Sequence, residues 1–526
     1  MKKLFFILIV ASIGLHSCNE SDFEENYPDP SKIAASTVDK QFSGFLQTNK
    51  DYVLKAYLNY FVVLRTTLSR WTQATGWTNA TNQYVPGEST ISNRWDNYYS
   101  LLTQYRELEK IYNALEPEDQ ERNEIYMLTA AVYLYDHTQK VVDLHGDIPF
   151  SEAGRLSQNG GDYIASLPAY DTAEAIYTFM LDDLLRIADR LNSINVNPGI
   201  QTGFNTQDFV NNGSIDLWKK YCNSLRLRML TRVSGVSEFQ SRSQSEINAI
   251  LTNPGAYPVV ENNSENIQID VVSLDTPIHS KGFRTGLEDW DGNVAGQKMI
   301  DHMLGNNDPR LRAMYEPGEE AGGVYQGIDP LANETVQSAM ISDGTVSIYN
   351  RSTLSRNEYF PGVLITAAEV SYLKSEAYLN AGNDAMAQSN YETGIQQSID
   401  YYYLLRTLSQ DEVSGPLTPL GATEIDDYIA TAGVNWGGAV TTDDKLNLLG
   451  TQKWIHYSVV QLPESWAEVR RLNQPGFNFF VDTANPQQLP PDRWKYPSGE
   501  RVNNEENYAA VSADDNLTTK IFWDVN

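Results

Sequence analysis

The clearest folding signal lies in residues 368 to 399, which read AEVSYLKSEAYLNAGNDAMAQSNYETGIQQSI. Apolar residues keep helical spacing on both sides of a Gly382-Asn383-Asp384 turn, and residues of these types end one helix and begin the next. The stretch therefore predicts two antiparallel helices joined by a tight turn. Helix pairs of this kind stack in tetratricopeptide-like packing, in which each pair buries its apolar face on its neighbour.

Helical spacing continues through most of the chain. A long first helix is predicted from residue 36 to residue 69, and the last helical region covers 444 to 472. Further helical stretches lie at about 95–114, 123–142, 172–191 and 217–233. The predicted fold class is therefore mainly α, built from tetratricopeptide-like helical pairs.

Residues 254–361 interrupt this helical pattern. They are rich in Gly, Asn, Asp and Ser and contain only short apolar runs such as 267–272, which predicts loops and small strands. Long loops inside a globular protein are more often functional than idle. We therefore expect this insertion to form a loop-rich lobe that binds a ligand.

The N-terminus has the layout of an exported lipoprotein. Residues 1–17 place Lys2 and Lys3 before an apolar run that is well short of the ~20 residues needed to cross a bilayer, which is typical of a cleaved signal peptide. Leu15-His16-Ser17-Cys18 is similar to a bacterial lipobox, so Cys18 is the predicted lipidation site. Several acyl chains together anchor a protein stably. Residues 18–35 are predicted to be an acidic tether, and residues 36–526 the folded body.

Charge and cysteine content exclude several classes of protein. The formal net charge is -29 and no basic stripe is present, so nucleic acid is not an expected partner. If Cys18 is acylated, Cys222 is the only other cysteine, and no disulfide framework can form. Stability must then come from a large core, and Cys222 is expected to be a small buried residue.

Several motifs, taken in chain order, resemble the SusD/RagB family of nutrient-binding lipoproteins, and especially its starch-binding, outer-membrane-associated branch. They run from an early NYPDP through LHGDIPF, NSLRLR, DPRL, AEV with SEA, QKW and WAEVRR to RWKYP, at residues 26–30, 144–150, 223–228, 308–311, 368–377, 452–454, 466–471 and 493–497. The resemblance covers nearly the whole chain, although no single motif is diagnostic. Arg310, Arg470 and Arg471 are expected to anchor loops and helix ends and not to contact the ligand, because a guanidinium group holds several acceptors at once.

The resemblance implies a function and a partner. A member of this family is a binding protein and not an enzyme, and it lies at the outer membrane, lipid-anchored, on the cell surface. It sits as a lid on a TonB-dependent SusC-like transporter, with the tetratricopeptide-like side toward the transporter and the loop-built lobe holding the ligand. The family binds glycans in some branches and peptides in at least one.

The candidate ligand-binding residues follow from local chemistry, because sugar C–H groups stack on flat aromatic rings while amides and charged groups bind the hydroxyls. Two polar, glycine-containing stretches supply both kinds of side chain. The predicted ligand-binding residues are Trp71, Gln73, Trp77, Asn79, Arg284, Asp289 and Trp290. Each tryptophan could equally be an ordinary packing residue.

Three alternatives to glycan capture stay open. The ligand could be a peptide held in a RagB-like way, the chain could be a lid that contacts only its transporter, or two of its many carboxylates could make it a glycoside hydrolase. No catalytic motif supports the hydrolase, so no catalytic residue is predicted. The sequence also predicts no metal site and no cofactor, since Asp289, Asp291 and Asn293 lack the later residues of a calcium loop.

Overall fold

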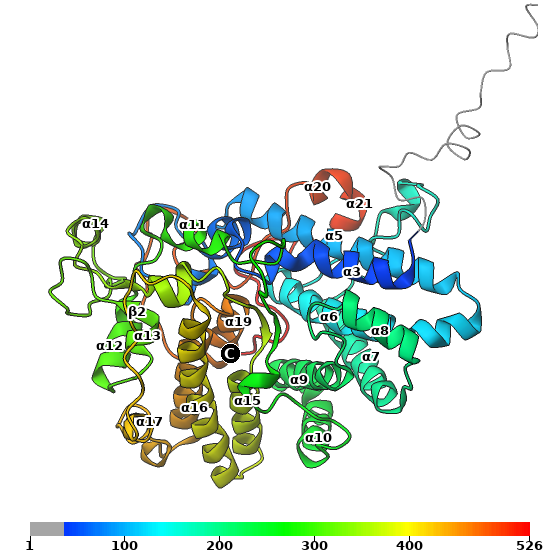
Figure 1. The fold of residues 1–526 in the computed structure, drawn as a ribbon. Helices are drawn as coiled ribbons and strands as arrows, with labels where there is room; N and C mark the ends of the chain where they lie inside the picture. Colours follow the sequence, from blue (N-terminus) through cyan, green and yellow to red (C-terminus); the bar gives the residue numbers. More distant parts are fainter. Residues whose placement is uncertain (1–35) are drawn as a thin grey trace, which may run out of the picture.

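The computed structural model describes residues 36–526, and the predicted signal peptide, lipidation site and tether lie outside them. Helix accounts for 56% of the structure and strand for 4%, which confirms the mainly helical prediction. In Figure 1 one group of helices fills the right side, in blue to green. Its members are α3 (Val38–Asn49), α5 (Glu88–Asn113), α6 (Pro117–His145), α7 (Ala173–Ser193), α8 (Pro198–Gln207), α9 (Ile215–Val233) and α10 (Ser237–Thr252).

A second group of helices lies at the lower middle of Figure 1 and contains the predicted hairpin. Its members are α15 (Ala367–Asn380), α16 (Asp384–Leu408), α17 (Glu424–Ile429), α18 (Thr442–Tyr457) and α19 (Leu462–Leu472). Gly382 adopts φ 75°, and the Asn383 side chain accepts from the amide of Met386 to begin α16. Gly394 allows α16 to approach closely, since a Cβ there would lie 2.5 Å from the Tyr372 ring. The hairpin prediction is confirmed.

The prediction of one long helix from residue 36 to residue 69 is wrong. The structure has α3, a 3₁₀ turn η1 (Lys50–Tyr52), a π-helix η2 (Leu58–Leu64) and a short α4 (Leu68–Trp71). Tertiary contacts explain the breaks: the Lys55 amide donates to Ser280 Oγ, and Gly282 approaches the Tyr57 backbone so closely that a Cβ would lie 2.4 Å away. Helical spacing in the sequence could not reveal these contacts with distant residues.

The predicted helical region at 444–472 consists of two helices, α18 and α19. Ser458 separates them with a left-handed φ of 27°, and its hydroxyl group lies 2.8 Å from the Tyr349 hydroxyl. Pro463 occupies the first turn of α19, where its missing amide proton costs no hydrogen bond. The apolar spacing continues across this break because both helices pack on the same core.

Residues 254–361 are loop-rich as predicted, but they also contain short helices, which lie at the left of Figure 1. These are α11 (Gly282–Glu288), α12 (Gln297–Gly305), α13 (Leu311–Met314) and α14 (Glu334–Ser342), with the helical turns η4 (Asn263–Glu265), η5 (Asp289–Asp291) and η6 (Arg351–Ser355). Strand β1 (Ile267–Ile269) pairs antiparallel with β4 (Gly362–Ile365), and β2 (Tyr315–Glu316) pairs with β3 (Ile348–Tyr349). The remaining short elements are η3 (Ile164–Ser166), η7 (Trp436–Gly438), α20 (Glu500–Asn503) and α21 (Glu505–Tyr508).

Buried arginines connect the helix groups. Arg228 of α9 donates to Asp136 of α6 at 2.8 Å and to Glu369 of α15 at 2.5 Å, while all three side chains are buried. Arg310, completely buried, binds Asp308 through two nitrogens. The Arg310 ion pair confirms that this arginine anchors the loop before α13. Cys222 is buried as expected.

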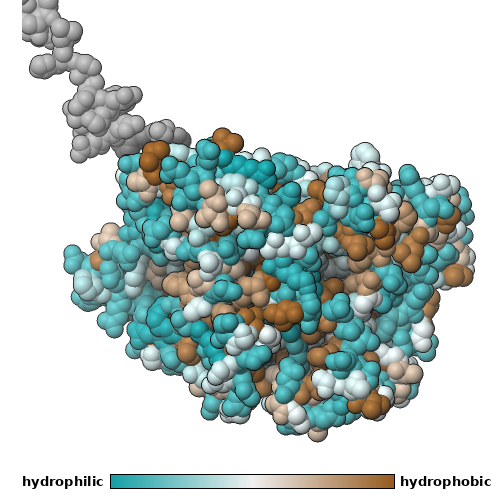
Figure 2. Space-filling model, turned by 180° about the vertical axis from the view of Figure 1, so that it is seen from behind, coloured by the Kyte–Doolittle hydropathy of each residue, from teal (hydrophilic) through white to brown (hydrophobic). Residues whose placement is uncertain are grey.

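The surface agrees with the composition. Figure 2 shows the side of the molecule opposite to Figure 1, where hydrophilic side chains predominate and apolar ones form separate small patches. Within residues 36–526, no helix has the length and apolar character required to span a membrane.

Candidate functional site: a polar cleft beside the loop-rich lobe

A cleft of about 720 Å³, a volume within the range of small-molecule sites, lies between the lobe and α18. Polar side chains line it together with apolar walls that include Leu331, Leu448 and Trp454. The polar residues are Gln73, Gln297, Lys298, Asp301, His302, Asp329, Asn447, Thr451 and Asn478. They come from five separate parts of the chain.

Three of these parts are held together by backbone contacts made through glycines. The amide of Gly76 donates to Val294 O at 2.8 Å, and a Cβ on Gly296 would lie 2.9 Å from Gln73 O. Gly327 likewise packs on Gln297, whose amide donates to Ile328 O at 3.0 Å. These close approaches place the loop after α4, the start of α12 and Asp329 around one opening.

Helix α12 presents its polar face to the cleft. Met299, Ile300 and Met303 are buried in the core behind it, while Lys298, Asp301 and His302 line the cleft. This division follows from the helical spacing of apolar and polar residues.

Burial also affects the protonation of the residues on this face. It lowers the pKa of Lys298, and it raises the pKa of Asp301, to which the nearby charge of Asp329 adds. It lowers the pKa of His302 to about 4, so this imidazole is neutral at pH 7.

The far wall of the cleft is fixed by hydrogen bonds and rings. Gln73, in a left-handed conformation with φ 49°, donates from Nε2 to Asn478 O at 2.6 Å. Trp454 donates from Nε1 to Thr72 O at 2.7 Å, and its ring meets the Phe477 ring edge-on at 5.4 Å. The cleft therefore offers carboxylates and amides between rigid apolar walls, which suits a ligand with many hydroxyl groups.

The structure places most of the predicted aromatic platform in the core, which corrects that prediction. Trp71 is 2% exposed and packs against Trp466 and Trp494, with ring centroids 5.3 and 6.4 Å away. Trp77 is 6% exposed and donates from Nε1 to Asn79 and Gln83. Neither tryptophan presents a ring face to a ligand. The loop had to fold back to bury these rings because both are large and apolar.

Asn79 and Gln73 also have structural contacts. Asn79 is 4% exposed and donates to the carbonyl oxygens of Pro330 and Ala332, so it supports the cleft wall from behind. Gln73 is the one predicted ligand-binding residue that lines the cleft.

The other three predicted residues form part of a separate exposed surface. Trp290 is 87% exposed and adopts φ 58°, a left-handed conformation that is unusual and costly for a bulky residue. Arg284 is largely exposed, with a long contact of 3.8 Å to Glu288, and Asp289 is exposed beside Trp290. These three residues are not among those that line the cleft.

Arg65 connects the loop that carries Trp290 with two further aromatic rings. The Arg65 side chain donates to the Asp289 carbonyl oxygen, and its guanidinium group lies 4.0 Å from the centre of the Phe61 ring. Tyr57 stacks on Phe61 with 4.9 Å between ring centroids and is 42% exposed. We call Tyr57, Phe61 and Trp290 the aromatic face. No local pattern pointed to Tyr57 and Phe61, since they lie within the stretch predicted to be one continuous helix.

Comparison with known proteins identifies the family. The family described as "starch-binding associating with outer membrane", SusD-like, matches residues 32–497. The chain belongs to the SusD-like family. Its members are binding proteins and not enzymes, and they associate with the outer membrane, as the sequence motifs implied. No match was found among curated proteins.

Solved structures share the fold across almost the whole chain. A chitin-binding protein superposes with a TM-score of 0.74 at 21% identity, covering 92% of this chain and 100% of its own. A chitin-binding SusD homologue from Flavobacterium johnsoniae gives 0.69 at 20%, covering 92% and 99%. A SusD homologue from Bacteroides fragilis gives 0.70 at 19%, covering 93% and 99%. At these identities the similarity establishes the SusD-like fold.

Proposed function

We propose that the protein captures an oligosaccharide at the cell surface and delivers it to a TonB-dependent SusC-like transporter. The observation that carries this proposal is the cleft of about 720 Å³, in which Asp301, Asp329 and several amides lie between apolar walls. Carboxylates and amides can bind sugar hydroxyl groups, and apolar walls can contact the C–H faces of the rings. Membership of a family described as starch-binding, and two chitin-binding structural relatives, support a glycan as the ligand.

The aromatic face extends the proposed site. An exposed tryptophan held in a costly left-handed conformation indicates a functional constraint, because its ring cannot contribute much to packing. Trp290 would stack on a sugar ring of a longer chain, and Arg284 and Asp289 would bind hydroxyl groups beside it. The proposed site thus keeps Arg284, Asp289 and Trp290 from the sequence prediction, but it does not include Trp71 or Trp77.

We also propose how the protein is anchored to the membrane and which surface binds the transporter. Cys18 would carry acyl chains, and residues 18–35 would tether the folded body at the outer leaflet. The transporter would bind the side formed by the tetratricopeptide-like helix pairs. Outer-membrane association of the family supports both proposals.

Calorimetric titration of the soluble protein, lacking residues 1–18, tests this function. The panel contains starch oligosaccharides, chito-oligosaccharides and mixed peptides. We expect saturable binding of one glycan class. By analogy with bases that stack on aromatic rings, Trp290→Ala should weaken it by ~1 to 3 kcal/mol, or roughly tenfold to hundredfold. Asp301→Asn should weaken it less, and Val440→Ala, which alters an equally exposed apolar side chain, should have no effect.

The outcomes separate the alternatives. If the protein binds peptides and no glycan, the ligand class is a peptide and ligand capture is still the function. Release of shorter sugars during the titration would indicate a glycoside hydrolase. Wild-type affinity in folded Trp290→Ala and Asp301→Asn proteins would refute the proposed site.

A further inference from the structure

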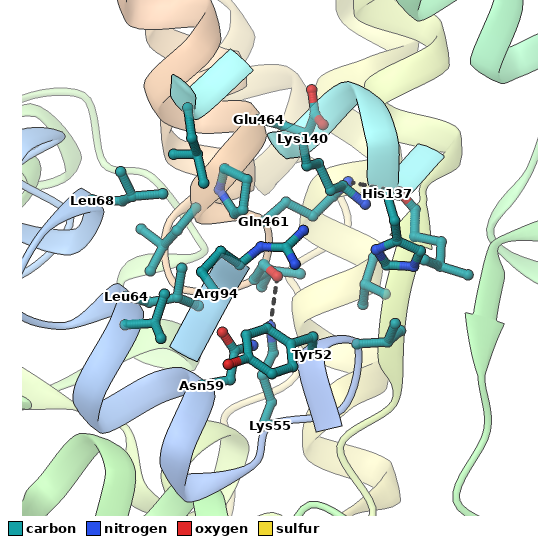
Figure 3. A pocket seen from close by; sticks show the side chains of 18 of the residues that line it. Tyr52, Lys55, Asn59, Leu64, Leu68, Arg94, His137, Lys140, Gln461 and Glu464 are labelled. Atoms are coloured by element: carbon teal, nitrogen blue, oxygen red, sulfur yellow. Dashed lines mark hydrogen bonds between the residues drawn. The ribbon is translucent and has the colours of Figure 1, made fainter. Parts of the chain in front are cut away.

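A second, much smaller cavity of about 60 Å³ lies between the helix groups, far below the volume of a sugar site. It is lined by residues of the segment from η1 to η2, of α5, α6, β4 and the start of α19. Four basic side chains line it: Lys55, Arg94, His137 and Lys140. Figure 3 shows Arg94, His137 and Lys140 pointing toward one another across the cavity.

In the part of the chain that the structure describes, two of these cations have no carboxylate partner. The Lys55 ammonium group donates to Val460 O at 2.6 Å (Figure 3). Arg94 has a long contact of 3.4 Å to Asn97 Oδ1, and its guanidinium group lies over the Tyr52 ring, 5.3 Å from the ring centroid. Within residues 36–526, neither side chain has a carboxylate oxygen within 4.0 Å, although each residue is only 6% exposed. Arginine keeps its proton at any relevant pH, so the charge of Arg94 is permanent.

The acidic residues near the cavity are already paired. Asp136 accepts from Arg228 at 2.8 Å, from Tyr221 at 2.7 Å and from Lys140 at 2.9 Å. Glu464 accepts from Arg232 at 2.7 Å, with Arg228 at 3.5 Å. Neither carboxylate is left over for Lys55 or Arg94, and the cavity therefore has an excess of positive charge.

The protonation of the lining groups agrees with this excess. Burial, together with the charge of Lys140, lowers the pKa of Lys55 to about 7. Burial also lowers the pKa of His137, whose Nε2 is buried without a hydrogen-bond partner. An unpaired buried charge is strongly unfavourable, and either proton loss or a counter-ion can relieve it.

We propose that this cavity binds a small monovalent anion of chloride size, held by Lys55 and Arg94 with His137 beside it. The volume accommodates such an ion and excludes larger organic anions. The anion would balance the cations at the junction of α5, α6 and α19. Because it would bind the folded chain only, it would raise the stability of the body.

The test compares thermal unfolding in sodium bromide with unfolding in sodium gluconate at equal ionic strength. Gluconate is too large for the cavity. We expect bromide to raise the melting temperature of the wild-type protein in a saturable way, with about a tenfold shift in the unfolding equilibrium at tenfold the dissociation constant. Lys55→Met and Arg94→Met should each lose this difference between the two salts. Lys110→Met, an exposed lysine on the same α5 helix as Arg94, should keep it.

Crystals grown in bromide give a second readout that does not depend on variant stability. An anomalous peak in the cavity, close to Lys55 Nζ and the Arg94 guanidinium group, supports the proposal. Density for water alone at these atoms would overturn it. Equal melting temperatures of the wild-type protein in the two salts would overturn it as well, as would an undiminished bromide effect in folded Lys55→Met.

Discussion

Replacing Arg310 with methionine should destabilise the body strongly, although the residue is not among those that line the cleft. Its guanidinium group binds Asp308 at 2.6 and 3.0 Å and donates to Ser398, Tyr428 and Gln452 at 2.8 to 2.9 Å. Arg310 therefore connects the start of α13 with α16, α17 and α18. Both Arg310 and Asp308 are almost completely buried.

The expected magnitude follows from this burial. Removing one partner of a buried ion pair leaves the other charge unpaired and costs about 3 to 5 kcal/mol. The unfolding entropy of a body of this length is roughly 1 kcal/mol per kelvin, so the melting temperature should fall by about 3 to 5 °C. Differential scanning calorimetry measures this change directly.

A neighbouring arginine on α13 provides the matched control. Arg312 also pairs with a carboxylate, Glu424, but its side chain is 27% exposed. Exposed ion pairs contribute about 0 to 1 kcal/mol, so Arg312→Met should lower the melting temperature by less than about 1 °C. The double variant Arg310→Met with Asp308→Asn should regain part of the loss, because no buried charge is then left unpaired. Equal effects of Arg310→Met and Arg312→Met would show that burial does not set the cost of losing the arginine.

Three other predictions test separate parts of the account. Cys18→Ala should release the protein from membranes, and its retention after a high-salt and carbonate wash would show that lipid is not the anchor. Detergent extracts should yield the wild-type protein together with a transporter-sized barrel, and recovery of the lipoprotein alone would contradict the partner. Burial lowers the pKa of His302 to about 4, compared with 6.5 in the unfolded chain. Between pH 6.5 and pH 4 the unfolded chain therefore binds a proton that the folded protein does not, and the free energy of unfolding falls as the pH drops through this range. His302→Gln should lose less stability over that range in urea titrations, and an unchanged slope would contradict the lowered pKa.

The sequence predicted the architecture well where local pattern and packing agree. The α15–α16 hairpin follows directly from apolar spacing around Gly382 and Asn383, and both residues adopt the roles expected of them. The prediction for residues 36 to 69 was wrong because glycines of α11 pack on the backbone of this segment near Tyr57. Such contacts leave no periodic trace in the sequence.

The site was harder to predict for the same reason. A tryptophan in a glycine-containing loop has no periodicity that tells an inward ring from an outward one, so Trp71 and Trp290 could not be distinguished. Asp301 and His302 could have been found from the sequence, because they lie on the polar face of a short amphipathic helix. Asp329 had none, because the contact of Ile328 with Ala295 and Gln297 brings it to the cleft.

A crystal structure of the protein with the oligosaccharide that binds most tightly in the calorimetric panel tests whether the cleft binds a glycan. We predict sugar rings in the cleft, with hydroxyl groups hydrogen-bonded to Asp301 or Asp329, and with the Trp290 ring stacked on a further sugar of a longer chain. Sugar density confined to another surface, with the cleft and Trp290 free of ligand, would contradict the account.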